Sequence, residues 1–209
     1  MTEIERRTVI KTALAAGAAA AIPSAASAAD KPLAGKSVLI TGASSGFGYL
    51  GALHYARLGA KVIASMRGLP RKEANELKAE AAKEKLGIHI IEIDVTSDEQ
   101  VAKGVAEAEK IAGGPIDILV NNAGVGYAGP IELQDMAATK LIFDTNVYGP
   151  HRVARAVLPG MRKAKRGVIF NISSQLGRVI VPSAGHYSPT KFALEAMSEA
   201  FSLVRRYGV

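Results

Sequence analysis

A tyrosine and a lysine four residues apart could form an acid–base pair near the end of the sequence. The segment 186–201, H-Y-S-P-T-K-F-A-L-E-A-M-S-E-A-F, places Tyr187 and Lys191 in an amphipathic helical pattern. Residues four apart share a helix face, and a cation beside a phenol favours the tyrosinate, since tyrosine ordinarily titrates at about pH 10. Such a pair could exchange the proton of an alcohol. The spacing alone is weak evidence in a chain with 6 tyrosines, and the alternative is a helix start with an exposed lysine.

A glycine-rich turn, T-G-A-S-S-G-F-G (41–48), directly follows the first β-branched run. Such a turn lets backbone N–H groups and a helix N-terminus face a pyrophosphate, and glycine is needed where a Cβ would block that approach. It is not a Walker A loop, because no Lys-Ser/Thr pair follows Gly48. The alternative is a tight strand-to-helix corner. The residues that we expect to contact a dinucleotide here are Gly42, Ser44, Ser45, Gly46, Phe47 and Gly48.

The end of the second apolar run bears on which dinucleotide binds. NAD sites commonly place an acidic residue here for the ribose 2′-hydroxyl, whereas this sequence has Met66 and Arg67. A guanidinium suits a 2′-phosphate, and Ser45 could add a hydroxyl. The alternative is that Arg67 is an ordinary exposed loop residue. We therefore expect NADP, with NAD the less favoured cofactor.

Short apolar runs alternate with helical patterns along the chain from Lys36 onward. The runs that read as strands are 37–40, 61–64, 88–93, 116–120 and 167–172. The segments that read as helices are 46–58, 71–86, 97–112, 135–163 and 188–207. Continuous apolar strands separated by helices predict an α/β fold with a doubly wound parallel sheet, covered by helices on both faces.

Taken together, these motifs resemble one protein family. Their order along the chain is that of the short-chain dehydrogenase/reductase family: T-G-x-x-x-G-x-G (41–48), N-N-A-G (121–124), Asn146, Ser174, Tyr187 and Lys191. The resemblance covers about residues 36–208, and its motif style is most similar to the hydroxysteroid and retinol dehydrogenase branch. It implies a Rossmann fold with strand order 3-2-1-4-5.

The resemblance also implies catalytic roles for four side chains. Tyr187 would be the general acid/base, and Lys191 would favour its tyrosinate form and reach the nicotinamide ribose, so both would touch the cofactor. Ser174 would hold the substrate oxygen, and Asn146 would support a water relay towards Lys191.

Asn146 also stands out on physical grounds. Pro150 follows it by four residues inside the predicted helix 135–163, and a proline cannot donate to the carbonyl four residues back. The pattern therefore predicts a kink and a free Asn146 carbonyl. The alternative is a plain proline kink with a surface asparagine.

Further cofactor contacts are implied by the family at the ends of the third and fourth strands. Asn121, Ala123 and Gly124 would pass close to the ribose, and Asp94 and Val95 would bracket the adenine. Asp94 could instead cap the helix that starts near 97. His186 is expected to border the substrate mouth rather than to act as the base.

These features predict an oxidoreductase that transfers a hydride between NADP(H) and an alcohol or ketone. The alternative is an NADP-binding sensor or scaffold with impaired catalysis. A sugar-nucleotide epimerase fits less well, because its glycine spacing and chain length differ.

Composition excludes several classes. The absence of cysteine rules out thiolate metal sites and disulfides, and the 4 histidines show no ligand spacing, so no metal is expected. The net charge of +7 is spread along the chain, and its densest cluster, 162–166, has no interleaved aromatics, so no nucleic-acid partner is expected.

The first 28 residues resemble a twin-arginine export signal. Arg6 and Arg7 precede an uncharged Ala-rich stretch that ends in A-S-A (26–28), a small-x-small cleavage site. We expect residues 29–209 to be the mature Rossmann domain, located in the periplasm without stable membrane insertion. The alternatives are an Ala-rich tail or docking helix on a cytoplasmic protein.

Family members usually continue past the helix that carries Tyr187, with further strands and a substrate lid, so the later strands are expected to be missing here. The strand 167–172 would then be an open sheet edge, which promotes self-association. We expect a homodimer or homotetramer, and poor solubility and turnover of residues 29–209 alone.

Overall fold

The computed structural model describes residues 31–204, and the signal-like segment 1–28 lies outside them. The described residues from Pro32 onward form one compact unit. Its five parallel strands are β1 (Ser37–Ile40), β2 (Lys61–Met66), β3 (Ile88–Glu92), β4 (Ile118–Asn121) and β5 (Val168–Asn171). Their spatial order, β3-β2-β1-β4-β5, confirms the predicted 3-2-1-4-5 topology.

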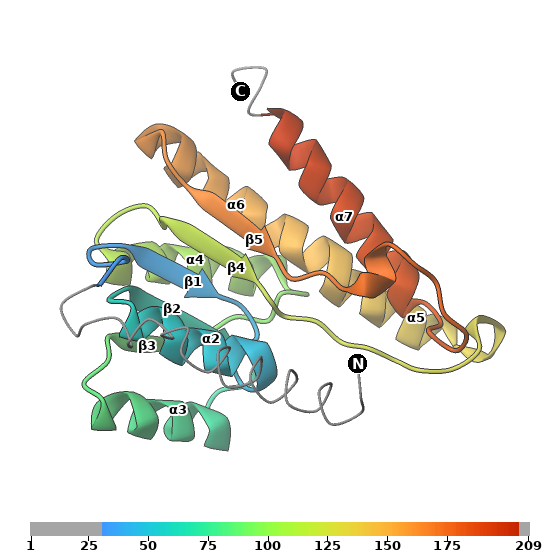
Figure 1. The fold of residues 1–209 in the computed structure, drawn as a ribbon, viewed down its shortest axis with the longest axis horizontal. Helices are drawn as coiled ribbons and strands as arrows, with labels where there is room; N and C mark the ends of the chain where they lie inside the picture. Colours follow the sequence, from blue (N-terminus) through green and yellow to red (C-terminus); the bar gives the residue numbers. More distant parts are fainter. Residues whose placement is uncertain (1–30, 205–209) are drawn as a thin grey trace, which may run out of the picture. The chain divides into compact units, whose positions relative to one another are not determined.

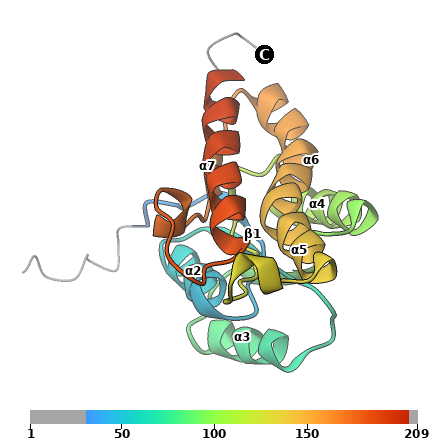
Figure 2. The same cartoon turned by 90° about the vertical axis from the view of Figure 1, so that its right-hand side faces the viewer.

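Helices cover both faces of this sheet. They are α2 (Gly46–Arg57), α3 (Lys72–Lys83), α4 (Asp98–Ala112), α5 (Met136–Phe143), α6 (Gly149–Ala164) and α7 (Tyr187–Val204). Figures 1 and 2 show α2 and α3 on one side of the sheet and α4 and α6 on the other, with α7 alongside α6. The two faces hold separate cores, because neighbouring strand residues point to opposite sides. Leu39, Ile63 and Leu119 pack against α4 and α6, whereas Val38, Val62 and Val120 pack towards α2 and α3.

Local signals in the sequence set the helix ends. Ser97 caps α4 by accepting the N–H of Gln100 at 3.2 Å, and Gly113, at φ +84°, ends the same helix. Asp135 caps α5 by accepting the N–H of Ala138 at 2.7 Å. These caps place the predicted boundaries within a few residues of the observed ones.

The predicted helix 135–163 is interrupted, which corrects the sequence-based expectation of one kinked helix. It consists of α5, a π-helical turn η2 (Asp144–Tyr148) and α6. The N–H of Gly149 donates to the carbonyl of Asp144, five residues back. Pro150 follows at the second position of α6, where its missing N–H costs little. The turn carries Asn146, whose side chain is buried.

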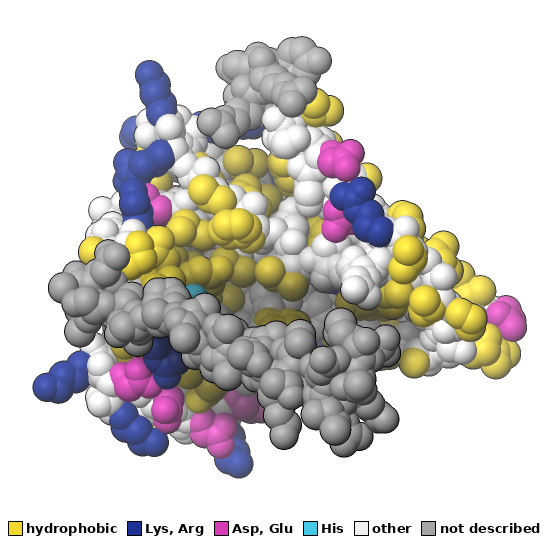
Figure 3. Space-filling model, viewed as in Figure 1, with side chains coloured by type: hydrophobic (Ala, Val, Ile, Leu, Met, Phe, Trp, Pro, Cys, Tyr) yellow, Lys and Arg dark blue, Asp and Glu magenta, His cyan; other side chains and the backbone are white. Residues whose placement is uncertain are grey.

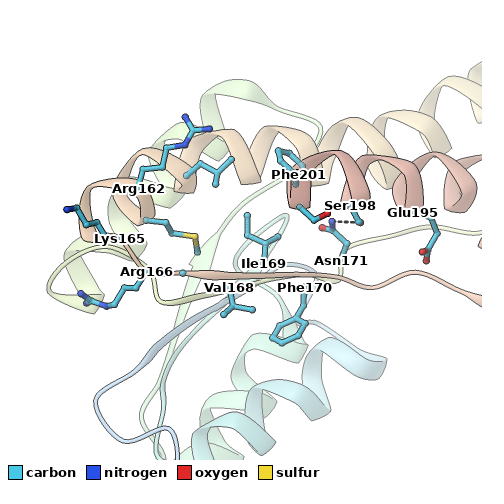
Figure 4. A pocket seen from close by; sticks show the side chains of 14 residues that line it. Arg162, Lys165, Arg166, Val168, Ile169, Phe170, Asn171, Glu195, Ser198 and Phe201 are labelled. Atoms are coloured by element: carbon cyan, nitrogen blue, oxygen red, sulfur yellow. Dashed lines mark hydrogen bonds between the residues drawn. The ribbon is translucent and has the colours of Figure 1, made fainter. Parts of the chain in front are cut away.

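Strand β5 is the edge of the described sheet. Val168 and Phe170 are 47% and 48% exposed, and a cavity of about 1170 Å³ runs between β5, α7 and the end of α6. Figure 4 shows Ile169 pointing towards α7, and Val168 and Phe170 pointing to the opposite side. Asn171 donates to Ser198 on α7 at 2.8 Å, which ties the end of β5 to that helix.

No helix between residues 31 and 204 combines the length and apolar character needed to cross a bilayer.

Candidate active site

The glycine turn after β1 is closely packed against the segment that follows β4. Gly42 has φ +67°, and a Cβ there would lie 2.7 Å from the Cα of Ala123. A methyl group at Gly48 would overlap the carbonyl oxygen of Gly42 and the side-chain amide of Asn122. Only glycine fits either position without moving backbone.

The N-N-A-G segment (121–124) is held to this turn by Thr41. The Thr41 hydroxyl oxygen accepts the backbone N–H groups of Asn122 and Ala123 at 3.0 and 3.1 Å. In return, the Asn122 amide donates to the carbonyls of Thr41 and Gly42 at 2.9 and 3.0 Å. Four hydrogen bonds therefore join the glycine turn to the N-N-A-G segment.

The N-terminus of α2 at this turn suits an anion. Ser45 precedes the helix in extended backbone and makes no side-chain cap bond, and the first turn of α2 has no acidic residue. The first N–H groups of a helix and its dipole favour negative charge. The turn therefore offers the donors that a pyrophosphate needs.

A second part of the site is the loop between β2 and α3. Arg71 donates to the carbonyl of Arg67 at 3.2 Å and forms a two-bond ion pair with Glu73 at 2.9 and 3.0 Å. This hydrogen-bonded pairing with Arg71 lowers the pKa of Glu73 to about 2. Glu92, at the end of β3, accepts the N–H groups of Gly68 and Leu69 at 3.1 and 3.2 Å. The loop is thus fixed, and Arg67 has no carboxylate partner within residues 31–204.

These parts enclose a cavity of about 350 Å³ at the carboxyl ends of the strands. Its lining includes eight of the residues predicted to bind the cofactor: Gly42, Ser44, Ser45, Arg67, Asp94, Val95, Ala123 and Gly124. It also includes Met66, Arg71, Ile93, Asn122, Val125 and Thr145. The buried Thr145 hydroxyl has no hydrogen-bond partner in the described chain. A glycine cradle, an anion-binding helix end, two guanidiniums and an unpartnered hydroxyl fit a phosphorylated dinucleotide.

Six predicted cofactor contacts are not part of this lining: Gly46, Phe47, Gly48, Asn121, Tyr187 and Lys191. Asn121 is buried below the cavity, and its amide donates to Asn171 at 2.9 Å, which supports the sheet. Phe47 is 81% exposed on α2 and is not part of the cavity lining, nor is Gly46. Asp94 both lines the cavity and caps its own loop, because its carboxylate accepts the N–H and hydroxyl of Thr96 at 2.9 and 2.8 Å.

Asn146 links the cavity wall to the helix that carries Tyr187. Its side-chain amide exchanges two 2.8 Å bonds with the backbone of Val125, and it also donates to the Thr190 hydroxyl at 3.1 Å. Thr190 in turn donates to the Tyr187 carbonyl at 2.7 Å. Gly126 follows Val125 and faces the Tyr187 ring, since a Cβ built there lies 3.5 Å from it. Asn146 therefore sets the spacing between the loop after β4 and Tyr187.

Tyr187 and Lys191 are side by side at the start of α7. The Lys191 ammonium lies 5.5 Å from the centre of the Tyr187 ring and donates to the carbonyl of Ile172 at 2.7 Å. Lys191 is only 6% exposed. Burial lowers its pKa, against an opposing effect of Glu195. The Tyr187 hydroxyl has no partner among the described residues, so its proton is available for exchange.

Ser174 lies two residues beyond the carbonyl that Lys191 binds. Its hydroxyl oxygen accepts the N–H of Leu176 at 3.1 Å, at the start of the short helix η3 (Gln175–Gly177). A hydroxyl that accepts in this way keeps its proton for another acceptor. Ser174 is half-buried, as is Tyr187.

Sequence reasoning missed Arg71, Glu92, Asn122 and Thr145. Arg71 follows Arg67 by four residues in a basic loop, and this repeat was a usable signal. Glu92 and Asn122 act through hydrogen bonds to the segment after a neighbouring strand, and Thr145 reaches the cavity from η2, and no spacing in the sequence reveals these contacts.

Comparison with known proteins gives a consistent result. A family model described as "short chain dehydrogenase" matches residues 36–207. Human retinol dehydrogenase 8 is 41% identical over 173 residues, which cover 80% of this chain and 53% of that protein. The 3-ketodihydrosphingosine reductase of Bacteroides thetaiotaomicron is 40% identical over 166 residues, covering 79% of this chain and 57% of that protein. The chain thus spans little more than half the length of these relatives.

Solved structures share the fold. A metagenomic short-chain oxidoreductase in complex with NADP superimposes with a TM-score of 0.77 at 30% identity, over 83% of this chain and 78% of the other. With the family match over most of the chain, the topology and the glycine turn, these findings establish that the chain belongs to the short-chain dehydrogenase family.

Proposed function

We propose that this chain is an NADP(H)-dependent oxidoreductase that interconverts an alcohol and a ketone, with Tyr187 as the general acid/base. The observation that carries the proposal is the unpartnered Tyr187 hydroxyl beside the buried Lys191 ammonium, 5.5 Å from the ring centre. A scaffold protein has no need of a desolvated cation at that place.

The residues would divide the work as follows. When bound, the cofactor supplies or accepts the hydride at the substrate carbon. In the reducing direction, the Tyr187 hydroxyl gives its proton to the substrate oxygen, and the Ser174 hydroxyl donates a hydrogen bond to the same oxygen. Lys191 stabilises the resulting tyrosinate. Asn146 keeps the Val125 loop at the right distance from Tyr187 through its paired 2.8 Å bonds.

The preference for NADP is part of this proposal. The support for it is the pair of guanidiniums, Arg67 and Arg71, in the lining of the cavity, and the NADP present in a structural relative. Relatives named for retinol and 3-ketodihydrosphingosine turnover agree with an alcohol or ketone substrate.

The deciding experiment is Tyr187→Phe, which removes the hydroxyl and keeps the ring. Loss of a general acid/base lowers turnover by about 10²–10⁴-fold, so we expect kcat to fall at least a hundredfold with secondary alcohols and ketones while the NADPH Kd stays within about twofold. Tyr55→Phe, a tyrosine change on α2, is the matched control and should keep its activity. A Tyr187→Phe enzyme with the parental rate would contradict the assignment.

We also propose export through the twin-arginine route, on the strength of Arg6, Arg7 and the A-S-A site (26–28). Replacing both arginines with lysine should retain the protein in the cytoplasm, as fractionation and N-terminal sequencing would show. An uncleaved N-terminus on the native protein would argue against export.

A further inference from the structure

The segment that carries Ser174 is tied to α7 at both of its ends. Before the serine, the Ile172 carbonyl accepts a hydrogen bond from the Lys191 ammonium at 2.7 Å. After the serine, the Arg178 guanidinium donates to the Glu195 carboxylate at 2.9 Å. Lys191 and Glu195 are four residues apart, so they lie on one face of α7, about one turn from each other. Two successive turns of α7 therefore hold the chain on both sides of Ser174.

Hydrogen bonds within η3 connect the second tie to the serine. The N–H of Gly177 donates to the Ser174 carbonyl at 3.0 Å, and the N–H of Arg178 donates to the Gln175 carbonyl at 2.9 Å. The Ser174 hydroxyl oxygen accepts the N–H of Leu176 at 3.1 Å. A displacement of Arg178 would therefore act on Ser174 through three short hydrogen bonds.

Gly177 lets η3 approach α7 closely. This glycine is buried, and a Cβ built on it would lie 3.1 Å from the carbonyl oxygen of Lys191 and 3.1 Å from the Cγ of Glu195. It would also lie 3.0 Å from the hydroxyl oxygen of Ser173. Atoms in favourable contact with carbon are about 3.5–4.0 Å away, so a side chain at this position would push η3 away from α7.

The ion pair between Arg178 and Glu195 is suited to setting a position and adds little to stability. The Arg178 side chain is 67% exposed and that of Glu195 is 26% exposed, and water and salt screen such pairs. Figure 3 shows acidic side chains adjoining basic ones on the surface where α7 lies in Figure 1. Glu199, one turn further along α7, is a more distant partner of the same guanidinium, at 3.9 Å.

The position of Ser174 matters because two elements supply the donors for one substrate oxygen. Tyr187 belongs to α7, whereas Ser174 belongs to the segment that follows β5. The separation of their hydroxyl groups therefore depends on how that segment is joined to α7. A misplacement of about 1 Å in such an arrangement can lower a rate by about a hundredfold.

We propose that Gly177, Arg178 and Glu195 are positioning residues, which hold the Ser174 hydroxyl at the distance from Tyr187 that a shared substrate oxygen requires. The inference rests on the proposed function and adds three residues to it. None of the three lines the cofactor cavity, so their effect falls on the chemical step and leaves cofactor binding unchanged.

The first test is Arg178→Ala, assayed with NADPH and ketones. We expect kcat to fall by about tenfold, because η3 loses one of its ties to α7. The NADPH Kd should stay within about twofold, and the melting temperature should change by no more than about 4 °C. Arg178→Lys keeps a cation and should recover most of the rate. Glu199→Ala, which removes the more distant carboxylate, is the matched control, and a tenfold loss in this control as well would overturn the inference.

A second set of variants asks whether Arg178 acts through Ser174. The fall in kcat caused by Arg178→Ala is measured in the parent and in a Ser174→Ala protein, which forms a double-mutant cycle. The fall should shrink to about twofold or less in the Ser174→Ala protein, because no hydroxyl is left to misplace. Gly177→Ala should behave in the same way. An equal fall in both backgrounds would show that Arg178 acts on another group and would overturn the inference.

Amide hydrogen exchange gives a measurement that needs no turnover. The N–H groups of Leu176 and Gly177 should exchange faster in Arg178→Ala than in the parent, because the opening of η3 becomes easier. Exchange at the parental rate would mean that the ion pair does not hold η3, and the inference would be wrong.

Tyr187→Phe separates this inference from the proposed function. If Tyr187→Phe loses its activity while Arg178→Ala keeps the parental kcat, the catalytic proposal stands and the positioning role is wrong. If Tyr187→Phe remains active while Arg178→Ala still lowers kcat only when Ser174 is present, the positioning of Ser174 stands and the acid/base group is not Tyr187.

Discussion

At the scale of single residues, the site depends on a few polar groups held in apolar surroundings. Lys191 is the clearest case, because its ammonium is buried and makes one hydrogen bond, to the Ile172 carbonyl. Burial lowers its pKa, which means that the folded chain holds this proton less tightly than the unfolded chain. The proposed chemistry therefore needs a positive charge on Lys191, although burial of this side chain disfavours its charged form.

This gives a prediction for Lys191→Met, which keeps the side-chain volume and removes the charge. Between the lowered native pKa and the ordinary value of 10.5, the unfolded state binds more protons, so the unfolding free energy of the parent rises with pH in that window. The variant should lose this rise. At pH 7 its unfolding free energy should be close to that of the parent, while its kcat should fall by about a hundredfold or more. Urea unfolding at several pH values and steady-state kinetics measure both. Lys72→Met, at an exposed position, is the control, and a Lys191→Met protein that is both active and much less stable would contradict the argument.

At the scale of elements, the loop between β2 and α3 and the π turn η2 do most of the positioning. The sequence predicted the strands from their hydrophobic runs, and the family resemblance implied their order, which the structure confirms. It also predicted that Gly42, Arg67 and Ala123 contact one ligand, and these three residues line the same cavity. The π turn was not predictable, because Pro150 signals an interruption without saying how the backbone resolves it. The ion pair of Arg71 with Glu73, and the support from Glu92, depend on side-chain directions that a linear pattern does not contain.

For the β2–α3 loop, we predict that Arg67→Ala weakens NADPH binding. A charge-assisted bond to phosphate contributes about 1.5–3 kcal/mol, or roughly a ten- to hundredfold change in Kd. NADH binding should change little, and Arg71→Ala should have a smaller effect because Glu73 already pairs with its guanidinium. Fluorescence titration of both cofactors measures this, with Lys72→Ala, outside the cavity lining, as control. Equal affinity of the parent for NADPH and NADH would refute the preference.

For the π turn, we predict that Asn146→Ala destabilises the fold as well as the site. The change leaves the N–H and carbonyl of Val125 without their 2.8 Å partners, and a buried unpaired polar group costs about 1–3 kcal/mol. Denaturant unfolding should show a loss of this size. Thr139→Ala, which removes one exposed bond on α5, should stay within about 0.5 kcal/mol. An unchanged Asn146→Ala midpoint would mean that Val125 finds other partners.

At the scale of the whole molecule, the sheet has a solvent-exposed side at β5. Within the part of the chain that the structure describes, β5 pairs with β4 alone, and its free edge lies next to a large cavity and two half-exposed apolar side chains. Unpaired backbone groups beside apolar side chains favour association with another strand. This exposed edge is the reason that we predict assembly into a dimer or tetramer.

We predict opposite outcomes for two neighbouring residues of this strand. Val168→Lys adds a charge to the exposed side, so it should reduce self-association in sedimentation experiments and change stability by no more than about 1 kcal/mol. Ile169→Lys places a charge against the core that α4 and α6 share, so it should cost about 2 kcal/mol or more. Similar effects of the two substitutions would mean that the strand does not have this orientation.

The π turn also has a consequence for how this protein tolerates changes in length. A five-residue turn is equivalent to one residue inserted into a continuous α-helix, and each residue of an α-helix turns it by about 100°. Deleting a single codon within 144–148 would therefore join α5 (Met136–Phe143) directly to α6 (Gly149–Ala164) and leave Pro150 inside a continuous helix, where it cannot donate to the carbonyl four residues back. It would also rotate the two halves of that helix against each other and carry the Asn146 position away from Val125 and Thr190. One deletion would thus disturb both the helix and the site, whereas an insertion in the loops 123–131 or 179–185 would leave the strand register untouched.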